Sequence, residues 1–264
     1  MIYTSQNPLK GKVVWISGAG RGIGASAAKA FAEHGASVVI QYLIDQASAE
    51  QVVQDCLSLG GDAIAYKADV RDPLQVQALF EHVLHEFGKV DVVVNNSFTH
   101  FEFNPETRKR FDQMPWLDFQ NQWNGALGAL YNTTQAVLPH FKSKGHGSIV
   151  NIVSNLTDRP VVPYHDYVAA KSAVLGLSKT LAMELGGYGI RVNCIAPGLV
   201  DPTASSTATK EDVKDQLRAL TPLKRVAAPH DINGPILFLA SDWSQFMTGQ
   251  VLTVDGGFVM SAGV

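Results

Sequence analysis

Cysteine and charged residues are scarce in this sequence. Of its 264 residues only two are cysteines, and Asp, Glu, Lys and Arg together make up 17%. Cys56 and Cys194 lie far apart and cannot form a disulfide framework, so we expect free, buried thiols in a reducing compartment. Hydrophobic residues reach 46%, which is ample material for a large core and excludes a disordered protein.

Long apolar runs and long basic runs are also missing. No stretch approaches the ~18 apolar residues that a membrane-spanning helix needs, and the start of the chain lacks the pattern of a secretory signal. The 24 acidic and 21 basic residues leave a net charge of -3, with no long basic run. We therefore expect a soluble, cytoplasmic protein with neither nucleic acid nor a membrane as partner.

Short β-branched segments alternate with longer amphipathic ones along most of the chain. Strands are predicted at residues 13–17, 37–42, 63–67, 90–95, 148–154, 190–195 and 250–254. Helices are predicted at residues 24–34, 46–59, 73–87, 116–144, 166–187, 210–219 and 231–240. The strand segments are apolar at consecutive positions, which is typical of strands covered on both faces. The pattern predicts an α/β fold over residues 1–264: a single-domain, Rossmann-like, doubly wound parallel sheet of about seven strands with helices on both faces.

Two segments depart from this alternation, residues 98–114 and 198–209. Each follows a predicted strand, and ligands of such sheets bind beyond the carboxyl ends of the strands. These segments are candidates for a substrate wall and a mobile lid, with ordinary surface loops as the alternative.

A glycine-rich turn follows the first predicted strand at residues 17–24 and leads into a helix. At this place backbone amides and the helix dipole attract a pyrophosphate. Glycines alone also suit a plain tight turn, but the strand-turn-helix context favours a nucleotide site.

Several motifs occur in a fixed order along the chain. They are Gly18-xxx-Gly22-x-Gly24, Asn95-Asn96-Ser97-Phe98, Ser154, Tyr167-xxx-Lys171, Pro197-Gly198 and Asp255-Gly256-Gly257. A lone Tyr-xxx-Lys is common on helix surfaces, but the combination is specific. Over roughly residues 10–258 the chain resembles the short-chain dehydrogenase/reductase family.

The resemblance implies a catalytic group of Ser154, Tyr167 and Lys171, with no metal. Tyr167 and Lys171 are one helical turn apart, so an ammonium near the phenol is expected to favour its ionised form. Ser154 would hold the substrate oxygen, and Tyr167 would pass the proton during hydride transfer between a nicotinamide and a carbonyl or secondary alcohol.

The cofactor site implied by the resemblance draws on residues from 17 to 200. Its residues are Ser17, Gly18, Arg21, Gly22, Ile23, Gly24, Gln41, Asp69, Val70, Asn95, Tyr167, Lys171, Pro197, Gly198 and Val200. Asp69 could instead be a turn residue before Pro73. Gln41 stands where an acidic residue would repel a 2′-phosphate and Arg21 adds positive charge, so NADP(H) is expected in preference to NAD(H), which stays possible.

The chain departs from the family pattern in two places. The family's Asn-Asn-Ala-Gly element is here Asn95-Asn96-Ser97-Phe98, which places bulk where the family has glycine, and Ala126 stands where the family has a catalytic asparagine that helps hold a water beside the lysine. Gly125 and Gly128 weaken the helix there and could preserve a bulge with a free carbonyl, and Gln122 could also reach that water. A cofactor-binding sensor or scaffold with little turnover is therefore the alternative to an active enzyme.

Substrate and assembly are predicted in outline. The chain resembles 3-oxoacyl-(acyl carrier protein) reductases most, so a small-molecule or acyl-thioester substrate is expected. An aromatic wall of Phe98, Phe101, Phe103, Trp116 and Pro163 would favour a hydrophobic substituent. Residues 108–110 could meet an anionic carrier or form a solvated charge run. Apolar faces on helical residues 126–141 and 169–185, with the segment 256–264, favour a homotetramer.

Overall fold

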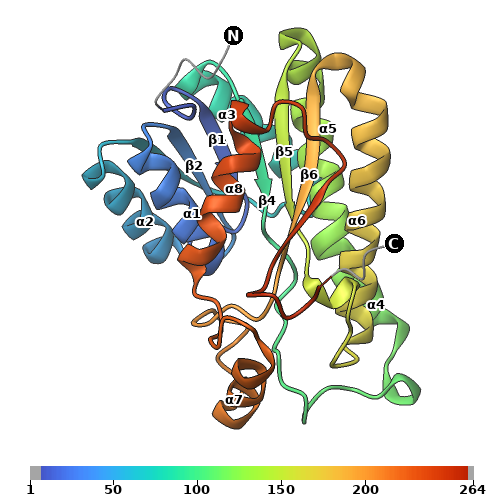
Figure 1. Ribbon diagram of the computed structural model, residues 1–264. Coiled ribbons are helices and arrows are strands. Elements are labelled where there is room, and N and C mark those ends of the chain that lie inside the picture. Colours follow the sequence, from blue (N-terminus) through green and yellow to red (C-terminus); the bar gives the residue numbers. More distant parts are fainter. Residues whose placement is uncertain (1–6, 261–264) are drawn as a thin grey trace.

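The computed structural model describes residues 7–260, and its centre is one seven-stranded sheet (Figure 1). The strands are β1 (Val13–Ile16), β2 (Ser37–Tyr42), β3 (Asp62–Lys67), β4 (Val92–Asn95), β5 (Gly147–Ile152), β6 (Ile190–Pro197) and β7 (Val251–Val254). All pairings are parallel, in the order β3-β2-β1-β4-β5-β6-β7. The order reverses between β1 and β4, which is the switch point where doubly wound sheets bind ligands.

Helices cover both faces of the sheet (Figure 1). They are α1 (Gly22–Glu33), α2 (Gln46–Ser58), α3 (Pro73–Phe87), α4 (Trp116–Trp123), α5 (Ala129–Lys144), α6 (His165–Leu185), α7 (Glu211–Leu220) and α8 (Asn233–Ala240). One face packs on α1, α2 and α8, and the other on α3, α5 and α6. Every residue of β1, β4 and β5 is buried, as the unbroken apolar runs predict.

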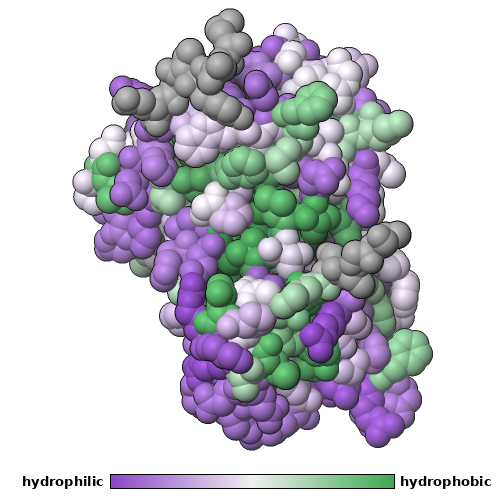
Figure 2. Space-filling view, viewed as in Figure 1, coloured by the Kyte–Doolittle hydropathy of each residue, from purple (hydrophilic) through white to green (hydrophobic). Residues whose placement is uncertain are grey.

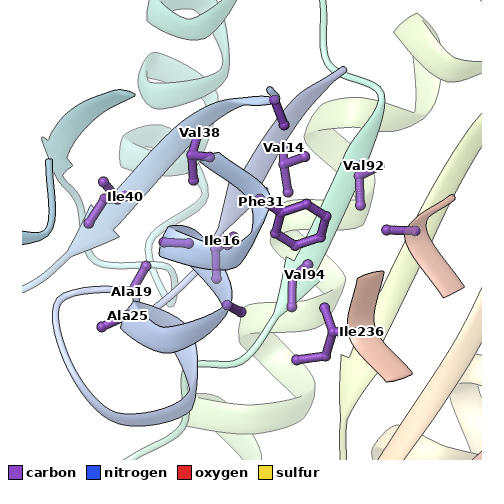
Figure 3. Close-up of a cluster of buried hydrophobic side chains, with 14 of the residues drawn as sticks. Val14, Ile16, Ala19, Ala25, Phe31, Val38, Ile40, Val92, Val94 and Ile236 are labelled. Carbon is purple, nitrogen blue, oxygen red and sulfur yellow. The ribbon is translucent and has the colours of Figure 1, made fainter. Parts of the chain in front are cut away.

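The core on the α1 side is built from alternate strand residues (Figure 3). Val14 and Ile16 of β1 point toward Phe31 of α1, and Val94 of β4 lies near Ile236 of α8. Phe31 is fully buried, so this contact fixes α1 against the sheet and with it the turn that precedes the helix.

The helix predicted at residues 116–144 is interrupted. The five residues Asn124–Gly128 form a π-helical turn between α4 and α5. A Cβ at Gly125 would lie 2.6 Å from the Thr99 backbone nitrogen, so glycine is required where the start of the 98–114 segment packs on the turn. The bulge expected around Gly125 and Gly128 is confirmed.

The segments that follow the strands gather at the carboxyl ends of the strands. There α7 lies apart from the two helical layers (Figure 1). No residue of α7 is buried, and its outward surface is hydrophilic, while apolar residues gather across the middle of the face in Figure 2. Within residues 7–260, no helix has the length and apolar character needed to cross a bilayer.

Candidate active site

A cleft of about 1220 Å³ runs along the carboxyl edge of the sheet. One end begins at the glycine turn and the strand ends β2 and β3, and the other is enclosed by the 98–114 and 198–209 segments and α7. The two segments predicted as wall and lid both line it.

The glycine turn is held open toward the cleft by neighbouring backbone. Gly18 and Gly22 have φ values of +64° and +58°, a region that favours glycine. A Cβ at Gly24 would lie 2.6 Å from the Gly18 carbonyl oxygen, so α1 can approach the turn only without a side chain. No side chain caps the first amides of α1. Free amides on a close-packed turn at a helix N-terminus fit a pyrophosphate.

Asn96 fastens this turn and was not among the predicted site residues. Its side-chain amide donates to the carbonyl oxygens of Ser17 (3.0 Å) and Gly18 (3.1 Å). The Ser17 hydroxyl accepts from the backbone amides of Asn96 and Ser97, so it ties β4 to the turn and does not face the cleft as a free group. The sequence signal for this role is the position of Asn96 directly after the predicted strand, as the second asparagine of the Asn95-Asn96 pair.

Gln41 lines the cleft, and its side-chain amide binds the neighbouring backbone. Its side chain is 2% exposed; the oxygen accepts from the Gly18 amide (2.8 Å), and the nitrogen donates to the Ala68 carbonyl (2.5 Å). Both polar atoms are therefore committed to backbone and cannot recognise a ribose substituent freely. The outer wall of the cleft here is formed by Arg21, Tyr42, Leu43, Ile44 and Asp45.

Asp69 and Val70 line the cleft beside this wall. The guanidinium of Arg71 binds both carboxylate oxygens of Asp69 at 2.6–3.1 Å and lowers the pKa of that carboxyl. Asp69 also begins a turn before Pro73, because its side chain accepts from the Arg71 amide (2.9 Å) and its carbonyl from the Asp72 amide (3.0 Å), while Asp72 is the N-cap of α3.

Asn95 lies behind the cleft, inside a buried polar chain. Its amide oxygen accepts from the Thr133 hydroxyl (2.6 Å), and its nitrogen donates to the Asn151 side chain (2.8 Å), which in turn donates to Ser178. The side chain is fully engaged in holding β4, β5, α5 and α6 together. Asn95 is absent from the lining of the main cleft, where Asn96 is present.

Pro197, Gly198 and Val200 follow β6 and line the floor of the cleft. The Gly198 amide donates to the Val254 carbonyl (3.1 Å), and a Cβ at Gly198 would lie 2.9 Å from the Asp255 Cβ. The Pro197-Gly198 and Asp255-Gly256-Gly257 motifs are thus in direct contact, which explains the need for glycine at 198.

Ser154, Tyr167 and Lys171 meet at the middle of the cleft. Ser154 follows β5, and the other two residues come from the first turns of α6. All three are buried, with the ammonium of Lys171 donating to the Ile152 carbonyl (2.8 Å). The nitrogen lies 5.9 Å from the centre of the Tyr167 ring.

Burial dominates the ionisation of this group. It raises the pKa of Tyr167 well above the usual range despite the Ser154 hydroxyl, which acts in the opposite direction. It lowers the pKa of Lys171 to about 8. Burial therefore favours the protonated form of the Tyr167 phenol, and the expectation that Lys171 favours its ionised form stays a prediction.

Aromatic rings enclose Tyr167. Phe101 stacks on it with ring centres 4.8 Å apart, while Phe98 and Phe103 approach edge-on at 5.9 and 5.3 Å. The Phe98 ring also lies 4.9 Å from the Lys171 nitrogen. Phe98, Phe103 and Tyr164 line the cleft, whereas Phe101 supports them from behind.

Part of the predicted wall lies elsewhere. Trp116 packs on Phe119 and Trp123 and is 58% exposed, and neither it nor Pro163 lines the cleft. Their places are taken by Val161 and Val162, by Val213 and Leu217 of α7, and by Leu223 and Phe258. These residues come from four separate segments, and no local pattern in the sequence brings them together.

The 98–114 and 198–209 segments are joined over the cleft. The Phe103 amide donates to the Ser205 carbonyl (2.9 Å), and the Thr209 hydroxyl donates to the Phe103 carbonyl (2.6 Å). Lys210 pairs with Glu106 at 2.7 Å. Lys109 and Arg110 pair with surface carboxylates, which suits a solvated charge run.

Ala126 is buried in the π-helical turn on the side facing Lys171. Gln122 is 5% exposed, but it lines neither cavity, so the expectation that it reaches a water beside Lys171 is not met. Cys56 and Cys194 are free and buried, as predicted. In the part of the chain that the structure describes, no His, Cys, Asp and Glu side chains gather as a metal site.

Comparisons with known proteins agree with this architecture. A family model described as enoyl-(acyl carrier protein) reductase matches residues 18–259. A 3-oxoacyl-(acyl carrier protein) reductase of Chlamydia muridarum is 38% identical over 255 residues, covering 94% of this chain and 98% of that protein. The crystal structure of a short-chain type dehydrogenase/reductase from Mycobacterium marinum matches with a TM-score of 0.84 at 29% identity, covering 95% of this chain and 96% of that one. A gluconate 5-dehydrogenase from Burkholderia cenocepacia, solved with NADP and tartrate, gives a TM-score of 0.86 at 30% identity, covering 98% and 99%.

The family model spans most of the chain, and the relative covers nearly its full length at well above 30% identity. The predicted fold class and family resemblance are confirmed. The chain belongs to the short-chain dehydrogenase/reductase family and is an oxidoreductase.

Proposed function

We propose that this enzyme reduces a carbonyl group next to a hydrophobic substituent, as in a 3-oxoacyl thioester, with NADP(H) as the preferred cofactor. One observation carries the proposal: Ser154, Tyr167 and Lys171 meet in a cleft that joins a pyrophosphate-fitting glycine turn to an apolar, aromatic end. The reductase relative is named for such a thioester, although the gluconate dehydrogenase shows that similar folds also serve polar substrates.

The proposed roles follow from the positions of the three side chains. The bound cofactor would supply hydride to the carbonyl carbon. The Ser154 hydroxyl holds the carbonyl oxygen, and the protonated Tyr167 phenol donates its proton to it. Lys171 stays beside Tyr167 as an ammonium fixed by the Ile152 carbonyl, and its charge stabilises the phenolate left behind.

The proposal is tested by measuring oxidation of the reduced cofactor with a panel of 3-oxoacyl thioesters, diketones and sugars. We expect turnover of medium-chain thioesters, and loss of nearly all of it in Tyr167→Phe. Comparable turnover of a small polar ketose would refute the hydrophobic preference.

A cofactor-binding sensor or scaffold is the second candidate function. It is favoured by one observation, the Phe98 ring that covers the Lys171 ammonium where the family has glycine. Binding of NADPH without turnover of any panel member, in wild type and Tyr167→Phe alike, would establish this alternative.

The preference for NADP(H) is supported by Arg21, which is exposed at the outer wall of the cleft. Asp45 on the same wall opposes it, because its carboxylate would repel a 2′-phosphate. We expect tighter binding of NADPH than of NADH, and weaker NADPH binding in Arg21→Ala with NADH binding retained. Calorimetric titration of both cofactors measures this, and an unchanged NADPH affinity in the variant would contradict it.

We further propose that the enzyme is a cytoplasmic homotetramer. Free, buried cysteines support a reducing compartment, and the outer faces of the predicted interface helices leave Tyr131 and Met183 54% and 89% exposed. The last four residues of the segment 256–264 lie outside the described residues. Light scattering at micromolar concentration is expected to give a mass near four times 28.5 kDa, and the monomer mass would reject the proposal.

A further inference from the structure

A second, small cavity lies behind the cleft, directly beside Lys171. Its volume is about 10 Å³, and its walls include Lys171, Asn95, Ser97 and Ala126. A cavity needs roughly 10–15 Å³ and two or more polar partners to hold one water molecule. This one is of that size, and part of its lining is polar.

The Lys171 ammonium needs more acceptors than the protein gives it. It is 3% exposed, and among the described residues its hydrogen bond is the one to the Ile152 carbonyl. An ammonium carries three N–H donors, and leaving them unpaired in a buried site is costly. Phe98 covers one side of the nitrogen with its ring but offers no lone pair.

The Ser97 side chain also lacks a hydrogen-bond partner among the described residues. Its hydroxyl oxygen is buried. Its backbone amide donates to the Ser17 hydroxyl (3.1 Å), which fixes the residue between the main cleft and the small cavity, and it lines both. Ala126, also in the cavity wall, has no polar side-chain atom.

We propose that Ser97 holds a water molecule against the Lys171 ammonium and is thereby a positioning residue for the reaction. The family pattern has Ala at this place and a polar Asn at the position of Ala126; this chain has a hydroxyl at 97 and a methyl at 126. In this chain the polar side chain therefore lies on a different wall of the same cavity, where it can still bind a water molecule beside Lys171. The inference rests on the proposed function, in which Lys171 acts as a charged group.

The titratable groups that face Lys171 are the Tyr167 phenol and the Cys194 thiol. Burial raises the pKa of both, that of Cys194 to about 11, so both stay protonated between pH 7 and 9. Loss of an acceptor at the ammonium favours the neutral amine. We therefore expect Ser97→Ala to lower the pKa of Lys171 by about one unit.

The experiment is a double-mutant cycle of Ser97→Ala, Ala126→Asn and the combined variant. The Lys171 pKa is read by NMR titration of ¹³C-labelled lysine in the cofactor-free protein, with assignment from Lys171→Arg, and again from the alkaline limb of kcat/KM. Ser97→Ala is expected to shift both by about one pH unit. In the combined variant the introduced asparagine supplies the lost polar group, so both return to within about 0.3 unit of wild type. Ser205→Ala, which alters a serine of the main cleft only, is the matched control and leaves the titration unmoved.

An NMR titration of Ser97→Ala that matches wild type would overturn the inference, and so would a shift that Ala126→Asn fails to reverse. The NMR titration needs no turnover. A protein that reduces no substrate but shows the shift and its reversal therefore refutes the proposed function while supporting the water site.

Discussion

Phe98 offers a test of how this enzyme controls its lysine. The centre of its ring lies 4.9 Å from the Lys171 nitrogen, and the residue is partly buried. Phe98 therefore acts on the ammonium in two opposite ways. Its π-system stabilises the positive charge, and its bulk keeps water away from it. The two effects are separable by substitution.

Phe98→Leu keeps much of the bulk and removes the π-system. A desolvated cation–π contact contributes about 1–2 kcal/mol, and one pKa unit corresponds to about 1.4 kcal/mol. The pKa of Lys171, about 8 in the wild type, is therefore expected to fall by about one unit in the Leu variant. Phe98→Gly admits water and moves the pKa upward, toward the ordinary lysine value of about 10.4.

The assay is the pH dependence of kcat/KM for carbonyl reduction, which reports ionisations of the free enzyme. Because the ammonium is the active form, wild-type activity is expected to be flat below pH 7 and to decline as pH rises through about 8. The decline moves to lower pH in Phe98→Leu and to higher pH in Phe98→Gly. If the alkaline decline of kcat/KM moves in the same direction in both variants, this account of Phe98 is refuted.

Three further outcomes are expected. The buried Asp91 carboxylate is bound by Lys144, the Val13 amide and Lys89, which hold its pKa at about 2 against 3.8 when unfolded. The carboxylate therefore stabilises the fold above pH 4, and this contribution is lost as pH falls toward 2. Asp91→Asn should cost about 2 kcal/mol at pH 7 in urea unfolding, with the difference shrinking below pH 4; a constant difference would contradict it. Gly24→Ala places a Cβ 2.6 Å from the Gly18 carbonyl oxygen and is expected to weaken NADPH binding more than tenfold by fluorescence titration, which an unchanged affinity would disprove. Thr209→Val removes the hydrogen bond to the Phe103 carbonyl that joins the two cleft segments, so kcat/KM should fall about 2- to 10-fold with the melting temperature kept; equal kinetics would show that the link is dispensable.

The sheet was predictable because its signal is local. Unbroken apolar runs such as residues 13–16 and 92–94 predict doubly covered strands from their own composition, and the helix signals between them favour parallel pairing. Strand ends were less certain: β6 continues to Pro197, two residues beyond its predicted end, because it pairs with β7 there.

The orientation of side chains at the cleft depends on contacts between distant segments. The place of Gln41 at the end of β2 predicts a cofactor contact, and in the structure its amide bridges Gly18 and Ala68. The sequence shows that a polar residue lies near the end of this strand. It does not show which backbone groups can form hydrogen bonds with its side chain. A buried amide takes the partners that would otherwise be left unpaired, and these are known only after the strands are assembled.

Lys171 shows the same dependence in its ionisation. The spacing of Tyr167 and Lys171 on one helix predicts an attractive charge pair, and that pair would lower the pKa of the phenol. Three rings from the 98–114 segment enclose the phenol, and burial raises its pKa against the lowering effect of the Ser154 hydroxyl. Those rings belong to residues 98–103, which form neither helix nor strand and are tied to Ser205 and Thr209 by hydrogen bonds of Phe103.

Ser97 and Ala126 show how two departures from a motif can offset each other. Taken singly, Ala126 looks like the loss of a polar group that the family uses, and Ser97 looks like a neutral change after two asparagines. The fold brings the two residues into the wall of one water-sized cavity beside Lys171. A polar group lost from one wall can then be offset by a hydroxyl gained on the other, because a water molecule can take its hydrogen bonds from either side. A deviation from a family motif is therefore evidence of lost activity only when the space around the missing atoms holds no substitute.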